Sequence, residues 1–119
     1  MILVVDDDKA FLEQAQTILN RDRQVIVVSD TDRAFDLAQH LGFAVALVDL
    51  DLRGEDGFAL IRKLRDTVPE LSIIAISSAA RNLTREDATK LGVVEVLTKP
   101  ITPEWKPVVE KIRAMRRTA

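Results

Sequence analysis

The sequence contains no cysteine among its 119 residues and only one histidine. The absence of cysteine excludes disulfides, thiolate nucleophiles and zinc sites built from thiolates. The single histidine, His40, lies in a segment with helical spacing shortly before Gly42. We interpret it as a surface residue rather than as a metal ligand or a catalytic base.

Long hydrophobic runs and an excess of one sign of charge are missing as well. The first residues lack a basic start and a long apolar region, and no apolar run approaches the roughly 20 residues of a membrane span. The 17 basic and 19 acidic residues give a net charge of -2, and the pI is near 5.4. These features argue against nucleic acid or a membrane as a direct partner and lead us to expect a cytoplasmic protein.

Five short runs rich in β-branched residues are present, and their even spacing predicts the fold class. Such continuous apolar runs are typical of strands buried on both faces of a parallel sheet. The expected strands cover residues 2–5, 25–29, 44–50, 72–77 and 93–99. They alternate with helical patterns over 8–20, 31–41, 57–66, 84–91 and a last segment that begins at Thr102. Without a linker or repeat, this alternation predicts one domain, 1–119, with an α/β doubly wound parallel sheet and helices on both faces.

Helical spacing and capping residues define the expected helices more closely. Thr84 and Gly92 mark the start and end of the fourth helix, and Thr102 with Pro103 marks the start of the last. Pro107 removes a backbone donor, so either the first turn of that helix is irregular or the regular helix begins near Trp105. The apolar faces of the first three helices are expected to contain Leu12, Ala15 and Leu19, then Phe35, Ala38 and Leu41, then Phe58, Ile61 and Leu64.

Polar side chains follow four of the expected strands, at the edge of the sheet where ligands of doubly wound folds bind. The residues at these strand ends are Asp6, Asp7 and Asp8, then Asp49 and Asp51, then Ser77 and Ser78, and finally Lys99. Two carboxylates about 4 Å apart repel by roughly 4 kcal/mol at an effective dielectric of 20, so such a cluster favours a bound cation. Mg²⁺ uses one or two carboxylates together with water and phosphate oxygens. A carboxylate in such a site can act as a nucleophile toward phosphate, with the serine and lysine as contacts to the phosphoryl group.

The pieces "ILVVDDD", "LVDLDLRGEDGF", "IIAIS" and "VLTKPI" resemble, in order and spacing, the receiver domain of two-component response regulators. The resemblance covers essentially the whole chain and implies the flavodoxin-like strand order 2-1-3-4-5. It implies that Asp49 is the phosphoacceptor and that Ser77 and Lys99 sense the phosphoryl group. It also implies that Asp7 binds Mg²⁺ directly, Asp6 mainly through water and Asp51 through its backbone carbonyl. A cis bond between Lys99 and Pro100 is implied too.

The resemblance further implies a signalling switch rather than an enzyme that turns over a substrate. A sensor histidine kinase or a histidine phosphotransfer protein supplies the phosphate, and the domain slowly removes it. The output face is expected over residues 84–117, with homodimerisation through that face as one possible outcome. Val96 stands where many members of the family carry an aromatic side chain that rotates on activation. No output module follows residue 119 in the sequence, so we expect a free-standing receiver or the front piece of a longer protein.

Three other interpretations use the same acidic residues. A calcium loop counted from Asp49 fails, because Arg53 and Leu60 fall where oxygen ligands are required. A phosphohydrolase of the haloacid dehalogenase type would use Asp49 as its nucleophile, although a late acidic pair that this family needs is missing. A flavin carrier is disfavoured because three aspartates after the first strand would repel its phosphate. A receiver-like binding module that is not phosphorylated also remains open.

Overall fold

The computed structural model describes residues 1–20, 24–54, 56–78 and 84–115. In these residues a five-stranded parallel sheet has the strand order β2-β1-β3-β4-β5. The strands are β1 (Ile2–Val5), β2 (Val25–Val28), β3 (Val45–Asp49), β4 (Ser72–Ser77) and β5 (Glu95–Thr98). The helices are α1 (Lys9–Leu19), α2 (Thr31–His40), α3 (Gly57–Thr67), α4 (Arg85–Leu91) and α5 (Lys106–Ala114), with the 3-10 turn η2 (Pro103–Trp105) before α5. The predicted fold class and strand order are confirmed.

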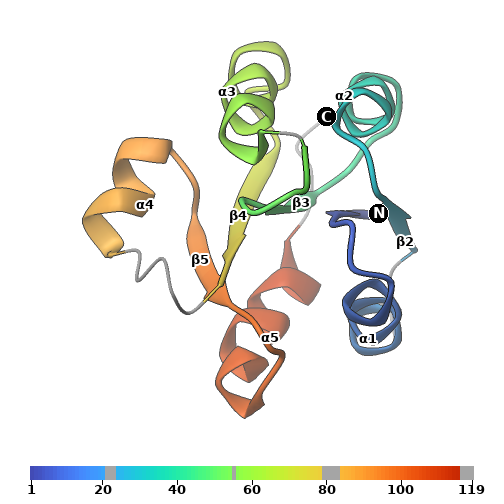
Figure 1. Ribbon diagram of the computed structural model, residues 1–119, viewed down its shortest axis with the longest axis vertical. Helices are drawn as coiled ribbons and strands as arrows, with labels where there is room; N and C mark the ends of the chain where they lie inside the picture. The colour runs from blue at the N-terminus through green and yellow to red at the C-terminus, as the bar shows by residue number, and fades with distance from the viewer. Residues whose placement is uncertain (21–23, 55, 79–83, 116–119) are drawn as a thin grey trace.

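The helices cover the two faces of the sheet in separate layers (Figure 1). Helices α1 and α5 pack on one face over a core that includes Val4, Leu47 and Ile76. Helices α2, α3 and α4 lie over the other face, where the core includes Leu3 and Val48. Every side chain of β1 and β3 is buried, which explains their continuous hydrophobic sequences. No described helix is long and apolar enough to cross a membrane.

Side-chain caps begin most of the helices. Asp8 caps α1, Asp30 caps α2 and Asp56 caps α3, each by accepting hydrogen bonds from backbone N–H groups of the first turn. Thr84 and Asp87 cap α4 reciprocally, and α4 ends at Gly92, whose φ is +74°. The capping residues therefore set the helix boundaries at or within a residue or two of the predicted ones.

The last helix resolves the question raised by Pro107. Residues Pro103–Trp105 form a 3-10 turn capped by Thr102, and the regular helix α5 begins at Lys106 with Pro107 in its first turn. A first-turn proline costs no hydrogen bond, because the N–H groups of the first turn have no partner within the helix. Pro107 is therefore compatible with helix α5.

The predicted faces of α2 and α3 pack against the core, but the most buried residues of these helices partly differ from the predicted ones. Ala34 and Ala38 are the buried residues of α2, whereas Phe35 and Leu41 are only partly buried. The centre of the apolar stripe passes through the two alanines, four residues apart, and leaves Phe35 at its margin. In α3 the same shift buries Leu60 and leaves Phe58 partly exposed.

Candidate functional site

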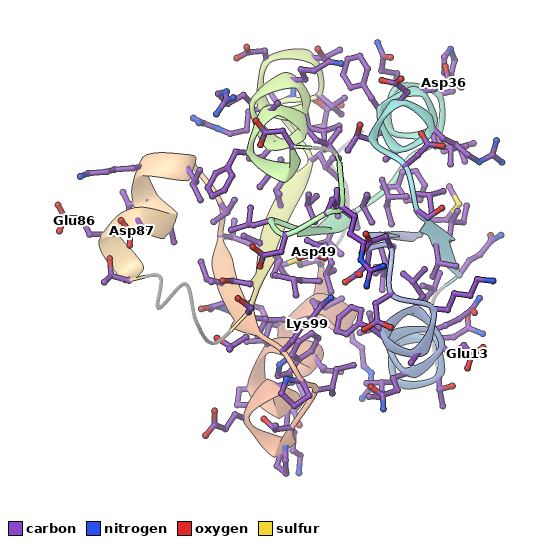
Figure 2. All side chains as sticks on the ribbon, viewed as in Figure 1. Glu13, Asp36, Asp49, Glu86, Asp87 and Lys99 are labelled. Carbon is purple, nitrogen blue, oxygen red and sulfur yellow. The ribbon has the colours of Figure 1, made fainter. Side chains whose placement is uncertain are left out.

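The parallel register of the strands brings the acidic side chains together. Val5 of β1 lies opposite Val48 of β3, so Asp6 and Asp49 follow at the same level of adjacent strands. Side chains alternate between the faces of a strand, and Asp6 and Asp49 both continue the set that faces α1 and α5. Lys99 follows β5 at the same end of the sheet, and Figure 2 shows Asp49 and Lys99 near the centre of the molecule. The labelled acids Glu13, Asp36, Glu86 and Asp87 lie at the periphery (Figure 2).

The ammonium of Lys99 lies between two buried carboxylates. Its Nζ is 2.6 Å from Oδ2 of Asp6 and 3.4 Å from Oδ2 of Asp49. Asp6 is fully buried, Asp49 is 2% exposed, and 23% of the Lys99 side chain remains exposed. Backbone N–H groups of Asp8 and Asp51 donate to Oδ1 of Asp6 and of Asp49, each over 2.9 Å. These contacts fix both carboxylates and direct one oxygen of each toward the lysine.

Burial and charge shift the pKa of two groups in this cluster. Burial raises the pKa of Asp6 above its usual range, although the close Lys99 ammonium and the hydrogen bond from the Asp8 N–H oppose the shift. Burial alone would lower the pKa of Lys99, but the carboxylates of Asp6 and Asp49 outweigh it and raise that pKa. Lys99 is therefore a permanent cation at neutral pH. One lysine faces several carboxylates, which leaves the cluster with excess negative charge.

A hollow of about 450 Å³ opens beside these residues and is lined by further polar groups. Asp7 borders it, and its Oδ2 accepts a hydrogen bond of 2.9 Å from the backbone N–H of Arg53. Asp51 borders it too, and its Oδ2 accepts one of 3.0 Å from the N–H of Ser78. These two bonds hold the loops after β3 and β4 around the hollow. Sequence reasoning did not select either donor, because a backbone N–H gives no signal in residue type.

Ser77 occupies a different position from the other predicted site residues. Its side chain is 2% exposed, and its hydroxyl donates to the carbonyl of Ser78 over 3.0 Å. Along β4, Ile74 and Ile76 face α1 and α5, so Ser77 falls in the alternate set that faces the other layer. Ser78, not Ser77, borders the hollow. The structure thus brings Asp6, Asp7, Asp49, Asp51 and Lys99 to one place and leaves the Ser77 hydroxyl turned into its own loop.

Gly57, the first residue of α3, packs directly against the backbone of Asp49. A Cβ atom at Gly57 would collide with the Asp49 carbonyl oxygen and would lie 2.9 Å from the Cα of Leu50. The first residue of α3 must therefore be glycine for the helix to approach β3 this closely. This approach sets the position of the Asp49 backbone relative to α3.

The carboxylates fit a hard divalent cation. One oxygen from each of Asp6, Asp7 and Asp49 lies within 4.8 Å of the others. Oδ2 of Asp6 is buried and accepts no aligned hydrogen bond from the described residues, although Lys99 lies close to it. Three converging carboxylates with a single compensating ammonium suit an oxygen-seeking ion such as Mg²⁺.

Lys99 has two further features. The peptide bond between Lys99 and Pro100 is cis, as predicted. The Nζ atom of Lys99 lies over the ring of Phe11, 4.6 Å from the ring centroid. Phe11 was not among the predicted residues of the first helix face, although it precedes Ala15 and Leu19 by four and eight residues and so shares their helical spacing.

The fold and the site agree with the similarity of the chain to known proteins. The family model for the response regulator receiver domain matches residues 2–106. The chain therefore belongs to the response regulator receiver family of two-component signal transduction. The photosynthetic apparatus regulatory protein RegA of Rhodobacter capsulatus is 30% identical over 100 residues, which are 83% of this chain and 54% of RegA. The chain spans about half the length of the curated relatives it matches.

Solved structures of receivers superpose closely on this chain. The receiver domain of NtrX from Brucella abortus gives a TM-score of 0.84 at 26% identity, over 94% of this chain and 97% of that one. A response regulator protein from Burkholderia pseudomallei was solved with a phosphorylated aspartic acid, a calcium ion and citrate. It gives a TM-score of 0.73 at 29% identity, over 95% of this chain and 70% of that one.

The expected output face lies around α4, β5 and α5, and the described residues cover 84–115 of it. Residues 116 and 117 of the predicted range lie outside the described residues. A hollow of about 370 Å³ on this face is lined by residues that include Ala88, Val96 and Lys111. Val96 is partly buried and packs against the core under α2, α3 and α4. None of the described residues that line this hollow is aromatic.

Proposed function

We propose that Asp49 accepts a phosphoryl group and that the chain is a phosphorylation-controlled switch. The observation that carries this proposal is the buried Asp49 carboxylate held 3.4 Å from Lys99 at the margin of an open, polar hollow. A phosphoryl group needs open space beside its acceptor and a cation to balance its charge. The Burkholderia relative with a phosphorylated aspartic acid supports the same assignment.

The transfer step is a displacement at phosphorus. An oxygen of the Asp49 carboxylate attacks the phosphorus of a phosphohistidine on the donor protein, and an O–P bond forms while the P–N bond breaks. The imidazole leaves and takes up a proton from water. In the reverse direction of the switch, water attacks the phosphorus, the O–P bond to Asp49 breaks, and inorganic phosphate is released. Both oxygens of Asp49 are oriented before the transfer, because Oδ1 accepts a hydrogen bond from the N–H of Asp51 and Oδ2 accepts one from Lys99.

Mg²⁺ is the proposed cofactor, and Asp7, Asp49 and the backbone carbonyl of Asp51 would hold it, with Asp6 acting mainly through water. When bound, Mg²⁺ supplies charge neutralisation for the phosphoryl oxygens. The side chain of Lys99 offers a permanent positive charge to the same oxygens. Asp6 keeps that ammonium at the site through the 2.6 Å contact.

The switch rests on Lys99 and Ser77. The new negative charge on Asp49 draws the Lys99 ammonium, and rotation of the Ser77 hydroxyl away from the Ser78 carbonyl supplies a donor to the phosphoryl group. These movements bias a pre-existing equilibrium of the face formed by residues 84–117. The phosphate donor is a sensor histidine kinase or a histidine phosphotransfer protein. A homodimer through that face, or a downstream effector, receives the signal.

We also propose that residues 1–119 form a single receiver domain of a cytoplasmic protein. The family match over residues 2–106 and the one continuous sheet support this extent. The half-length coverage of the curated relatives is compatible with a longer natural protein.

Phosphorylation of Asp49 by a small phosphodonor tests the proposal. Intact-mass measurement with acetyl phosphate and Mg²⁺ should show one added phosphoryl group on the wild type and none on Asp49→Asn. Asp36→Asn, which changes an exposed acid of α2, should label as the wild type does. Labelling that survives in Asp49→Asn would remove Asp49 from its role. Turnover of phosphate esters without stable labelling would instead favour a phosphohydrolase.

A further inference from the structure

The ammonium of Lys99 lies close to two carboxylates and to an aromatic ring. Asp6 and Asp49 approach it at 2.6 and 3.4 Å, and the ring of Phe11 lies 4.6 Å from it. Phe11 comes from α1 and is 4% exposed, so its ring is fixed by the core under α1 and α5. A ring face attracts a cation without competing for its hydrogen bonds. Phe11 therefore limits where the ammonium can lie.

Trp105 in turn fixes Phe11. Its ring meets the Phe11 ring edge to face, with centroids 5.7 Å apart and planes at 64°. The indole N–H of Trp105 donates to the carbonyl of Thr98 over 2.9 Å, one residue before Lys99. The two rings are thus tied both to α1 and to the end of β5. Trp105 is the only tryptophan of the chain.

Trp105 also borders the groove between α1 and α5. This groove has a volume of about 380 Å³ and is lined mainly by apolar groups such as Ile18, Ile101 and Val109. A continuous line of contacts therefore runs from Asp49 through Lys99, Phe11 and Trp105 to an open surface. On the opposite side of β5, Val96 offers no ring to the hollow near α4.

We propose that Phe11 and Trp105 position Lys99 and transmit its displacement to the groove between α1 and α5. The inference rests on the proposed function, because phosphorylation of Asp49 supplies the charge that moves the ammonium. When the ammonium follows that charge, its contact with the Phe11 ring changes, and the edge contact between Phe11 and Trp105 adjusts with it. The groove beside α5 then differs between the two states of Asp49.

The fluorescence of Trp105 reports this coupling directly. Wild-type protein is treated with acetyl phosphate and Mg²⁺, and the emission of the single tryptophan is followed while intact mass measures the label on Asp49. We expect the emission to change in proportion to the label. In Phe11→Leu, which keeps an apolar side chain but removes the ring, the change per label should fall by about half or more. Phe11→Tyr keeps the ring face and should restore it.

Phe35→Leu is the matched control. Phe35 also lies under a lysine, with Nζ of Lys63 4.6 Å from its ring centroid, but on the opposite face of the sheet. This variant should keep the full emission change. Equal responses in Phe11→Leu and the wild type, or a labelled wild type with unchanged emission, would overturn the coupling while leaving Asp49 as the acceptor. Absence of any label would overturn the proposed function itself and the coupling with it.

A measurement on the wild type covers the case in which Phe11→Leu does not fold. The ring current of Phe11 should shift the ε-protons of Lys99 upfield of those of exposed lysines in the NMR spectrum. Labelling of Asp49 should move these resonances toward the ordinary lysine position. Lys99 ε-protons at ordinary positions before labelling would overturn the proposal, as would resonances that stay unmoved when Asp49 is labelled.

Discussion

Lys99 supplies the positive charge that compensates the buried carboxylates of the site. Its ammonium compensates two buried carboxylates, neither of which has an equally close cation among the described residues. Removing one partner of a buried ion pair leaves the other charge without compensation, which usually costs more than the pair itself contributes. The lysine thus has a structural effect that is separate from any contact with phosphate.

Lys99→Met tests that effect through its pH dependence. At pH 7 without divalent ions, the variant should lose roughly 1–3 kcal/mol in the free energy of unfolding. The folded-state pKa of Lys99 is raised, so its stabilising contribution is complete below pH 10.5 and declines as the pH rises through the folded pKa. Urea unfolding of both proteins between pH 7 and pH 11.5 measures the difference. A difference that grows with pH would contradict the assignment.

Asp87 shows the opposite shift in a different setting. Its carboxylate accepts hydrogen bonds from the backbone and the hydroxyl of Thr84, and these bonds lower its pKa below 3.8. The cap therefore stabilises α4 above that pH and is lost as the pH falls through the lowered pKa. NMR titration of the carboxyl carbon should give a pKa below 3.8 in the wild type and a higher value in Thr84→Ala. An unchanged pKa in the variant would show that the Thr84 hydroxyl does not contribute and that the backbone N–H of residue 84 lowers the pKa without it.

The sequence predicted the meeting of the charged residues but not the direction of every side chain. Asp6, Asp49 and Lys99 each follow a strand directly, and parallel strands end at one edge, so their proximity follows from topology. The Ser77 hydroxyl was expected at the same place. Its orientation depends on strand alternation and on a rotamer choice, and here it donates to the Ser78 carbonyl. Phe11 was missed because its contact with Lys99 joins residues that are 88 positions apart in the sequence.

At the scale of secondary structure, the first turn of α3 lies directly against the backbone of Asp49. Gly57 allows its first turn to touch the backbone of Asp49. If α3 moved away from β3, the packing of Leu60, Ile61 and Leu64 against the sheet would be lost. Helix position and acceptor geometry are therefore linked.

Gly57→Ala should destabilise the protein by about 1–3 kcal/mol, because its Cβ would collide with backbone atoms that cannot rotate away. It should also slow labelling of Asp49, since the acceptor loop must move. Gly42→Ala is the control: nothing lies within 4 Å of a Cβ at that position, and its free energy of unfolding should change by less than about 0.5 kcal/mol. Thermal melts and phosphodonor labelling measure both. Equal melts would show that the loop absorbs the methyl group.

Element boundaries were predictable where a residue type has a single local role. Thr84 and Gly92 mark helix ends in the sequence and in the structure alike. The choice between Phe35 and Ala34 as the buried residue of α2 was not predictable in this way. It depends on the rotation of the helix about its axis, which the packing of α2 against β1 and α3 sets.

At the scale of the whole molecule, the converging carboxylates predict that stability depends on divalent cations. Mg²⁺ should raise the melting temperature relative to NaCl of equal ionic strength, and a concentration 100 times the dissociation constant adds about 2.7 kcal/mol. Asp7→Asn should lose most of this gain, because Asp7 belongs to the carboxylate cluster. Asp32→Asn, at an exposed position in the first turn of α2, should keep it. An equal gain in both variants would place the cation elsewhere.

The common register of β1 and β3 also constrains how the gene for this domain can vary in length. Asp49 faces the lysine because side chains alternate along β3, and the preceding residue, Val48, points to the other face of the sheet. One codon inserted or deleted between Val45 and Val48 would turn Asp49 toward α3 and bury it there without a partner. Point substitutions can adjust this site gradually, whereas a change of length within β3 would remove it in one event.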